Sequence, residues 1–183
     1  MRLQPMPLDL AQAARGAVAG AVAAGVWGLQ QPLDKRVFGV DYDDTELLGK
    51  LVTRGPAWKA VGAVLHVANG AAFGAAYATL ASRVPLPSWA RGPLAGLVEH
   101  AATWPLTAVT DRFHPARDEL PTLFGSGRAL AQATWRHALF GVVLGELERR
   151  LNAPKDPEVP AYEHVASSSN GHGSLEHAIP SAG

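Results

Sequence analysis

The sequence contains no cysteine among its 183 residues. Disulfides, thiolate metal sites and cysteine nucleophiles are therefore excluded. It also has no excess of either charge, since 16 basic residues balance 16 acidic ones. Binding to nucleic acid by bulk electrostatics needs a basic excess, so we expect no nucleic-acid partner. Charged residues as a whole are scarce, at 17% against about 25% in a typical soluble domain.

Signatures of catalysis are missing as well. The chain has no Gly-x-Ser-x-Gly nucleophile motif, no phosphate-binding loop and no dinucleotide-binding glycine fingerprint. Ser126, which lies between two glycines, is typical of a flexible turn. We therefore expect a protein that is not an enzyme and that carries no cofactor.

Long segments without charge are present instead. Residues 16–33 and 60–82 contain no formally charged side chain. As helices these segments would reach about 27 and 34 Å, enough to cross a hydrocarbon layer of about 30 Å. Two later apolar segments are each interrupted by a single polar pair. The pattern predicts an all-α integral membrane four-helix bundle, whose predicted spans are residues 12–33, 57–82, 90–110 and 128–150.

The segments between and after these spans are polar. The acidic run after the first span predicts a short interfacial helix that begins with Asp44 or Thr45 as its cap and ends at Leu51. Residues 111–121 form a densely charged loop, expected to face lipid headgroups. Residues 152–183 are rich in Pro, Ser and Gly and are predicted to be a disordered tail, which leaves 1–151 as the transmembrane domain. The tail helps explain a mean hydropathy of only +0.03.

Two other interpretations of the spans are open. A soluble Ala-rich bundle should give every helix a polar face, and the first two spans have almost none. A cleaved signal peptide would account for the first span, with Arg2 and Arg15 as its basic leader. Basic residues divide almost evenly between the two sides of the predicted membrane, so the positive-inside rule assigns no orientation.

An internal repeat argues that the first span belongs to the fold. Residues 15–20 and 91–96 both read Arg-Gly-x-x-Ala-Gly, which indicates a duplicated helix pair and two parallel repeats. Every span also carries a Gly-x-x-x-Gly motif, which lets helix backbones approach closely in lipid. The glycines predicted to pack helices together are Gly16, Gly20, Gly70, Gly74, Gly92, Gly96, Gly141 and Gly145.

Polar side chains continue the glycine faces of the last two spans. In the third span, His100 follows Gly96 by four residues. In the fourth, His137 precedes Gly141 by four residues, so each histidine shares a helix face with the glycines of its span. Antiparallel packing should bring these histidines together and put Arg136 within reach of Glu99. Polar groups at membrane depth usually face the interior and pair with one another. The predicted polar cluster contains Glu99, His100, Arg136, His137, His66, Asn69, Gln30 and Gln31.

This cluster has three interpretations. It can be structural, made only of hydrogen bonds and one ion pair between helices. It can handle protons or a small ion, because histidine titrates near neutral pH and burial moves a glutamate toward it. It can hold a metal or haem between facing imidazoles, although no metal-site spacing such as His-Glu-x-x-His is present.

Several motifs resemble the YagU-like family of bacterial inner-membrane proteins. They are Gly16-x-x-Ala19-Gly20, Trp27-Gly28, Pro32-Leu33, Ala95-Gly96, His100-x4-Pro105-Leu106, Leu120-Pro121, His137, Glu148-Arg149-Arg150-Leu151 and Asp156-Pro157-Glu158-Val159-Pro160. The resemblance implies a multi-pass inner-membrane protein of poorly defined function, loosely associated with acid tolerance. The family has an acidic residue after Trp-Gly, where this chain has Gln30. The bilayer is the expected partner, and the helices fit either a closed bundle or half of a homo-oligomer.

Overall fold

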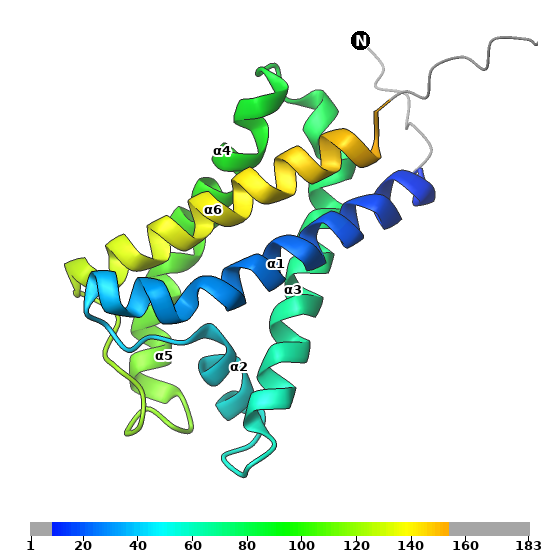
Figure 1. Cartoon of the computed structure of the whole chain (residues 1–183). Helices are drawn as coiled ribbons and strands as arrows, with labels where there is room; N and C mark the ends of the chain where they lie inside the picture. The colour runs from blue at the N-terminus through cyan, green and yellow to red at the C-terminus, as the bar shows by residue number, and fades with distance from the viewer. Residues whose placement is uncertain (1–8, 154–183) are drawn as a thin grey trace, which may run out of the picture. The chain divides into compact units, whose positions relative to one another are not determined.

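A computed structural model describes residues 9–153, and within that range the chain is helical with no strand (Figure 1). The prediction of an all-α fold is confirmed. The predicted tail, apart from its first two residues, lies outside the described residues. The elements are α1 (Leu10–Phe38), α2 (Asp44–Val52), α3 (Trp58–Leu80), the 3-10 turn η1 (Ala81–Arg83), α4 (Ser88–Thr103), the 3-10 turn η2 (Trp104–Leu106), α5 (Thr107–Phe113) and α6 (Gly127–Leu151).

The ends of the helices have local causes in the sequence. Asp9 caps α1, since its Oδ1 accepts the backbone N–H groups of Ala11 and Gln12 at 2.9 and 3.0 Å. The helix stops at Gly39, which adopts a left-handed φ of 67°. Ser126 caps α6 through its hydroxyl, which accepts the N–H of Ala129 at 3.2 Å. α1, α3 and α6 therefore cover the first, second and fourth predicted spans with ends a few residues away.

The short helix α2 was predicted, but its cap was placed wrongly. Asp43 is the capping residue, because its Oδ1 accepts the N–H groups of Thr45 and Glu46 at 2.9 and 3.1 Å. Its backbone is extended, with φ −135° and ψ 116°, as the capping position requires. Three adjacent residues can each serve as an N-cap, and only the backbone conformation selects one of them.

The third predicted span is not one continuous helix. α4 ends at Thr103, and the chain passes through η2 before α5 begins at Thr107. Pro105 has no N–H to donate to the preceding turn and interrupts the α-helical bonding there. The Thr107 hydroxyl donates to the Trp104 carbonyl at 2.7 Å, so this carbonyl oxygen has a hydrogen-bond donor where the helix is interrupted. The structure therefore divides the predicted span over 90–110 between α4 and α5, which η2 joins.

The long helices pack in the order α3–α1–α6–α4. α1 contacts α3 on one side and α6 on the other, and α6 also contacts α4. In Figure 1, α1 and α6 run side by side, and α3 crosses α1. α2 packs against α3. Because α3 and α4 barely touch each other, the four long helices form an open row within the described residues.

Glycines let the helices of each pair approach closely. A Cβ atom added to Gly20 of α1 would lie 2.9 Å from Gly74 Cα of α3. One added to Gly92 of α4 would lie 2.7 Å from Gly145 Cα of α6. Both distances are too short for real atoms, so a side chain cannot fit at these crossings. The structure thus places the predicted packing glycines of the α1–α3 pair and of the α4–α6 pair at equivalent contacts, as a duplicated helix pair would.

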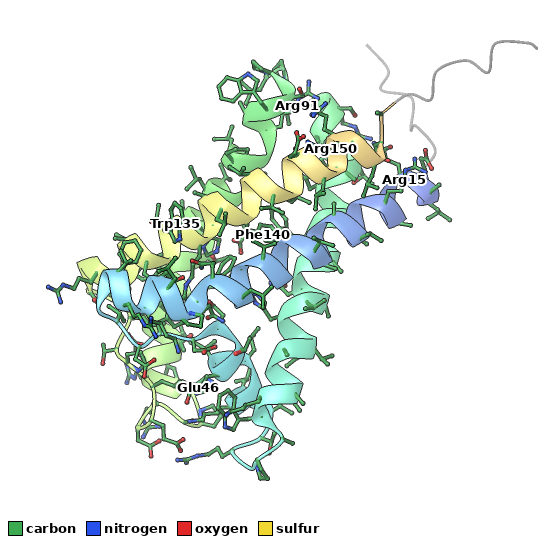
Figure 2. All side chains as sticks on the ribbon, in the orientation of Figure 1. Arg15, Glu46, Arg91, Trp135, Phe140 and Arg150 are labelled. Atoms are coloured by element: carbon green, nitrogen blue, oxygen red, sulfur yellow. The ribbon has the colours of Figure 1, made fainter. Side chains whose placement is uncertain are left out.

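Many large aliphatic side chains are exposed, while several charged and amide side chains are buried. The described core contains small residues, a few larger apolar ones (Trp27, Tyr77, Leu123, Phe140 and Leu144), and polar side chains of which Arg136 and Gln132 are 0% exposed. Large aliphatic side chains lie outside, as for Leu29 at 84% and Val64 at 68% exposed. Figure 2 shows how the side chains of the described residues are arranged along the helices. Of the helices described, one, Trp58–Arg83, is long and apolar enough to cross a membrane, and only 28% of its most apolar window is buried.

Candidate functional site

A pocket of about 270 Å³ lies between the helices. α1 and α6 form its base, α3 and α4 form its sides, and residues of α2, η2 and α5 complete its lining. Five residues of the predicted polar cluster, brought together from three helices, line it: His66, Asn69, Glu99, His100 and His137. Arg136, Gln30 and Gln31 do not line this pocket and belong to a network behind it.

Glu99 and His137 form an ion pair that joins α4 to α6 in the pocket. Glu99 Oε2 lies 2.9 Å from His137 Nε2. His137 Nδ1 lies 2.7 Å from the Ala133 carbonyl oxygen. Because a carbonyl only accepts, Nδ1 carries a hydrogen. At Nε2 the contact is an ion pair when the imidazole carries a second proton.

The other two histidines in the pocket bond to the helices opposite them. His100 Nε2 lies 3.0 Å from Thr134 Oγ1 of α6, and His66 Nε2 lies 3.1 Å from the Ala24 carbonyl of α1. The Trp27 ring lies between the two halves of the molecule, with centroid distances of 5.4 Å to His66 and 4.6 Å to His137. Trp27 therefore contacts both His66 and His137, and the rings of His100 and His137 are 4.6 Å apart.

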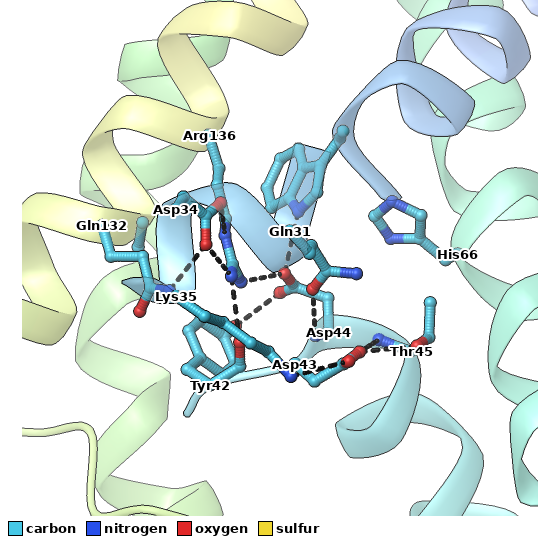
Figure 3. A network of polar contacts seen from close by, with 12 residues as sticks. Gln31, Asp34, Lys35, Tyr42, Asp43, Asp44, Thr45, His66, Gln132 and Arg136 are labelled. Carbon is cyan, nitrogen blue, oxygen red and sulfur yellow. Dashed lines mark hydrogen bonds and ion pairs between the residues drawn. The ribbon is translucent and has the colours of Figure 1, made fainter. Parts of the chain in front are cut away.

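Arg136 does not reach Glu99, contrary to the prediction. Neighbouring residues of a helix point about 100° apart, so when His137 faces α4, Arg136 turns toward α1. Arg136 Nε and Nη2 bind the two carboxylate oxygens of Asp34 at 2.7 and 2.6 Å. Arg136 Nη1 binds Asp44 Oδ2 at 2.7 Å (Figure 3). The guanidinium is fully buried and joins α6 to α1 and α2.

Amide side chains surround Asp34 and Asp44. Gln132 Nε2 donates to Asp34 Oδ1 at 2.7 Å, and Gln30 Nε2 donates to Asp34 Oδ2 at 2.5 Å. Gln31 Oε1 accepts the Asp44 backbone N–H at 3.0 Å. Gln30 and Gln31 thus position the two carboxylates that bind Arg136, rather than lining the pocket itself.

Asp44 connects this network to the pocket. Its Oδ2 accepts Trp27 Nε1–H at 2.8 Å, and its Oδ1 accepts the Tyr42 hydroxyl at 2.6 Å. All three of these residues line the pocket. Burial, and next the charge of Asp44, raises the pKa of Tyr42 well above its ordinary value, so the phenol stays protonated and donates. Because Asp34 and Asp44 share one guanidinium, the network carries one formal negative charge beside the pocket.

The charged loop before α6 is attached to α2. Lys50 Nζ binds Glu119 Oε2 at 2.6 Å and Glu46 Oε1 at 2.5 Å. Glu119 also binds Arg54. The hydrogen bond from Lys50, followed by that from Arg54, lowers the pKa of Glu119. His114 Nε2 lies 3.0 Å from the Leu47 carbonyl, so the loop and α2 close one end of the pocket together.

The sequence analysis missed Asp34, Asp44, Tyr42, Trp27 and Gln132 as site residues. Asp34 was interpreted as a loop charge because it directly follows an uncharged segment, yet α1 continues to Phe38 and buries it. One signal was available. A buried arginine needs a carboxylate partner, and His137 competes with Arg136 for Glu99.

The described residues offer no metal centre. Among residues 9–153, no group of three or more His, Asp or Glu side chains is arranged to hold a metal ion. The pocket histidines each lie within hydrogen-bonding distance of a protein oxygen instead. The interpretation as a metal site therefore has no set of three such donors among the described residues.

Comparisons with protein families, with curated proteins and with solved structures found no match to this chain. The resemblance to the YagU-like family stays a prediction, and the site is argued from its geometry.

Proposed function

We propose that this chain is a multi-pass integral protein of the bacterial inner membrane, whose pocket binds and exchanges a proton through the Glu99–His137 pair. It is not proposed as an enzyme. A contribution to acid tolerance is the cellular role that fits such a site and the family resemblance.

The membrane placement is supported by the exposed apolar side chains. Many Val and Leu side chains lie on the outside of the long helices, while the Arg136 network is buried together with small residues and a few larger apolar ones. In water such a surface would aggregate, because soluble monomers rarely expose apolar patches larger than a few hundred Å². In lipid the same surface is solvated, and polar groups are expected inside.

The lengths of the helices are compatible with several crossings. α1, α3 and α6 have 29, 23 and 25 residues, about 44, 35 and 38 Å at 1.5 Å per residue. α4 has 16 residues, about 24 Å, and needs η2 and α5 to extend it. A broken helix is tolerated at membrane depth where it lines a cavity, as Trp104 and Thr107 do here.

The proton-binding role is carried by the Glu99–His137 contact. Nδ1 of His137 lies against the Ala133 carbonyl oxygen, so the 2.9 Å contact at Nε2 places one proton between an imidazole nitrogen and a carboxylate oxygen. The Glu99 side chain is 32% exposed, which gives the proton a route to the pocket.

The membrane placement can be tested by cysteine labelling, since the natural chain contains no cysteine. Val64→Cys puts a thiol on the outer face of α3, and Ala57→Cys puts one just before the same helix. In membranes opened to both sides, a water-soluble maleimide should label Ala57→Cys and leave Val64→Cys unlabelled until the membrane is dissolved in SDS. Equal labelling of the two thiols in intact membranes would overturn the placement.

The proton site can be tested with purified protein labelled with ¹⁵N-histidine. Following the imidazole nitrogens over pH, we expect Glu99→Gln to shift the titration of His137 by at least about one pH unit, since an amide cannot share the proton. Glu146→Gln, an exposed change in the ion pairs near the end of α6, should leave it unchanged. An unaltered His137 curve in Glu99→Gln would refute the proton site.

The alternative of a purely structural membrane protein is favoured by one observation, the closely packed glycine contacts of both helix pairs. In that case the pocket histidines only join helices. Glu99→Gln would then act through loss of folded protein alone, which the same titration and the amount of folded protein distinguish.

A further inference from the structure

We propose that the pocket binds a small organic ammonium ion beside Glu99, and that its binding displaces the proton of the Glu99–His137 pair. The displacement rests on the proposed function, whereas the ammonium site itself does not.

The charge of the pocket favours a cation. Its charged lining residues are the carboxylates Asp44 and Glu99, and no lysine or arginine side chain lines it. Arg136 lies behind Asp44 and is already shared with Asp34. An anionic ligand would meet two carboxylates, whereas a cation would offset the surplus negative charge of this region.

The aromatic lining favours an organic cation over a metal ion. Rings from α1, the loop before α2, α3, η2 and α6 surround the space: Trp27, Tyr42, Phe73, Trp104 and Phe140. Aromatic faces attract ammonium groups through their quadrupoles, and Trp does so best. A small metal ion needs a shell of oxygen or nitrogen donors, and the described residues supply no such group of three.

The size of the pocket limits the ligand. Sites for drug-sized molecules occupy about 300–1,000 Å³, and this one has about 270 Å³. An ammonium group with a few carbon atoms fits that space. The apolar part of the ligand would contact Leu47, Leu48 and Leu123, which line the same pocket.

Glu99 is the carboxylate available to such a ligand. Asp44 already accepts from Trp27, Tyr42 and Arg136. Glu99 uses Oε2 toward His137, and within residues 9–153 its Oε1 makes no hydrogen bond. The other titratable groups facing this space are Tyr42, Asp44, His66, His100 and His137.

Cation and proton should therefore oppose each other. A bound ammonium next to Glu99 repels the proton held on the pair, and the proton leaves to solvent while the carboxylate and neutral imidazole stay. No covalent bond forms, and one positive charge replaces another. By linkage, protonation weakens cation binding by the same factor as the cation weakens proton binding.

The test is isothermal titration calorimetry on the full chain in a non-ionic detergent. The probes are tetramethylammonium, choline and benzylammonium, with 3,3-dimethylbutanol as the uncharged counterpart of choline. We expect at least one ammonium to bind saturably, the alcohol to bind at least tenfold more weakly than choline, and a proton to be released, seen as a heat that depends on the ionisation enthalpy of the buffer.

Variants place the binding in the pocket. Glu99→Gln and Phe73→Leu should each weaken ammonium binding at least tenfold, and Glu146→Gln should leave it unchanged. Phe73→Leu removes the aromatic ring but keeps an apolar side chain, so it tests the pocket even if Glu99→Gln fails to fold. Binding that is equal in the Glu146→Gln and pocket variants would overturn the site.

The two proposals fail separately. If none of the three cations binds, or if the alcohol binds as well as choline, the ammonium site is wrong, while the histidine titration still decides the proton site. If a cation binds without proton release, the exchange is wrong and the ammonium site stands.

Discussion

At the scale of single residues, Arg136 organises the interior. It is fully buried and binds Asp34 through two oxygens and Asp44 through one. Removing a charge from water is costly, and the attraction offsets this only when the hydrogen-bond geometry is good. Here the guanidinium also donates to the Tyr42 carbonyl at 2.9 Å. The network therefore holds α1, α2 and α6 in one arrangement.

Replacing Arg136 should be severely destabilising. Arg136→Gln leaves the buried Asp34 and the part-buried Asp44 carboxylates without their cation, and breaking a buried pair in this way costs about 3–5 kcal/mol. We expect a large fall in the unfolding midpoint of the detergent-solubilised protein, measured by thermal denaturation. Arg128→Gln, an exposed change on the same helix, should have little effect. Similar midpoints for the two variants would contradict the role of the network.

At the scale of helices, close glycine contacts set the two pairs α1–α3 and α4–α6. A third contact of the same kind joins α2 to α3, where a Cβ on Gly49 would lie 3.1 Å from Gly62 N. The sequence analysis missed it, because these two glycines lie on different helices and neither belongs to a Gly-x-x-x-Gly motif. Such contacts are specified by the shape of the partner helix as well as by the spacing of small residues.

A matched pair of alanine substitutions should separate packing from helix propensity. Gly141→Ala puts a Cβ 2.9 Å from the Gly92 carbonyl carbon, whereas a Cβ at Gly28 meets nothing within 4 Å. Overpacking should cost Gly141→Ala about 1–3 kcal/mol, while Gly28→Ala should be neutral or stabilising by up to about 1 kcal/mol. Thermal denaturation of both variants checks this. A stable Gly141→Ala would show that α4 and α6 do not meet at this crossing.

The contact between α2 and the loop before α6 should weaken in acid. Lys50 and then Arg54 lower the pKa of Glu119 from its ordinary 4.5. The contact is therefore fully present above pH 4.5 and is lost as the pH falls through the lower value in the folded protein. Hydrogen exchange in residues 114–121, corrected for the intrinsic rate, should rise below pH 4. Glu119→Gln should show the faster exchange already at pH 7, and protection equal to wild type would contradict the contact.

At the scale of the whole molecule, an open row of helices encloses a polar pocket under an apolar exterior. α3 and α4 lie at the two ends of the row and α1 and α6 in its middle. The two ends of the described chain come together, since Arg15 Nε donates to Asn152 Oδ1 at 2.5 Å. In the membrane placement proposed above, this contact would put both ends of the described residues on one side.

If the pocket handles protons in cells, Glu99→Gln should impair survival in acid while the protein remains present at normal level. The physical reason is loss of the shared proton without loss of the Arg136 network, which Glu99 does not contact. Survival after acid challenge and the amount of protein in the membrane are measured together, with Glu146→Gln as control. Normal survival in Glu99→Gln, or a defect that follows protein level alone, would favour the structural alternative.

The sequence by itself determined the helical class, the approximate ends of α1, α3 and α6, and the glycines and histidines that meet between them. These features follow from periodicity and local charge, which act over a few residues. Only the tertiary structure decided the break after α4, the open order of the helices and the partner of Arg136. Pairing depends on which helix face turns toward which neighbour. Adjacent residues of a helix point about 100° apart, so His137 faces Glu99 of α4 while Arg136 faces Asp34 and Asp44.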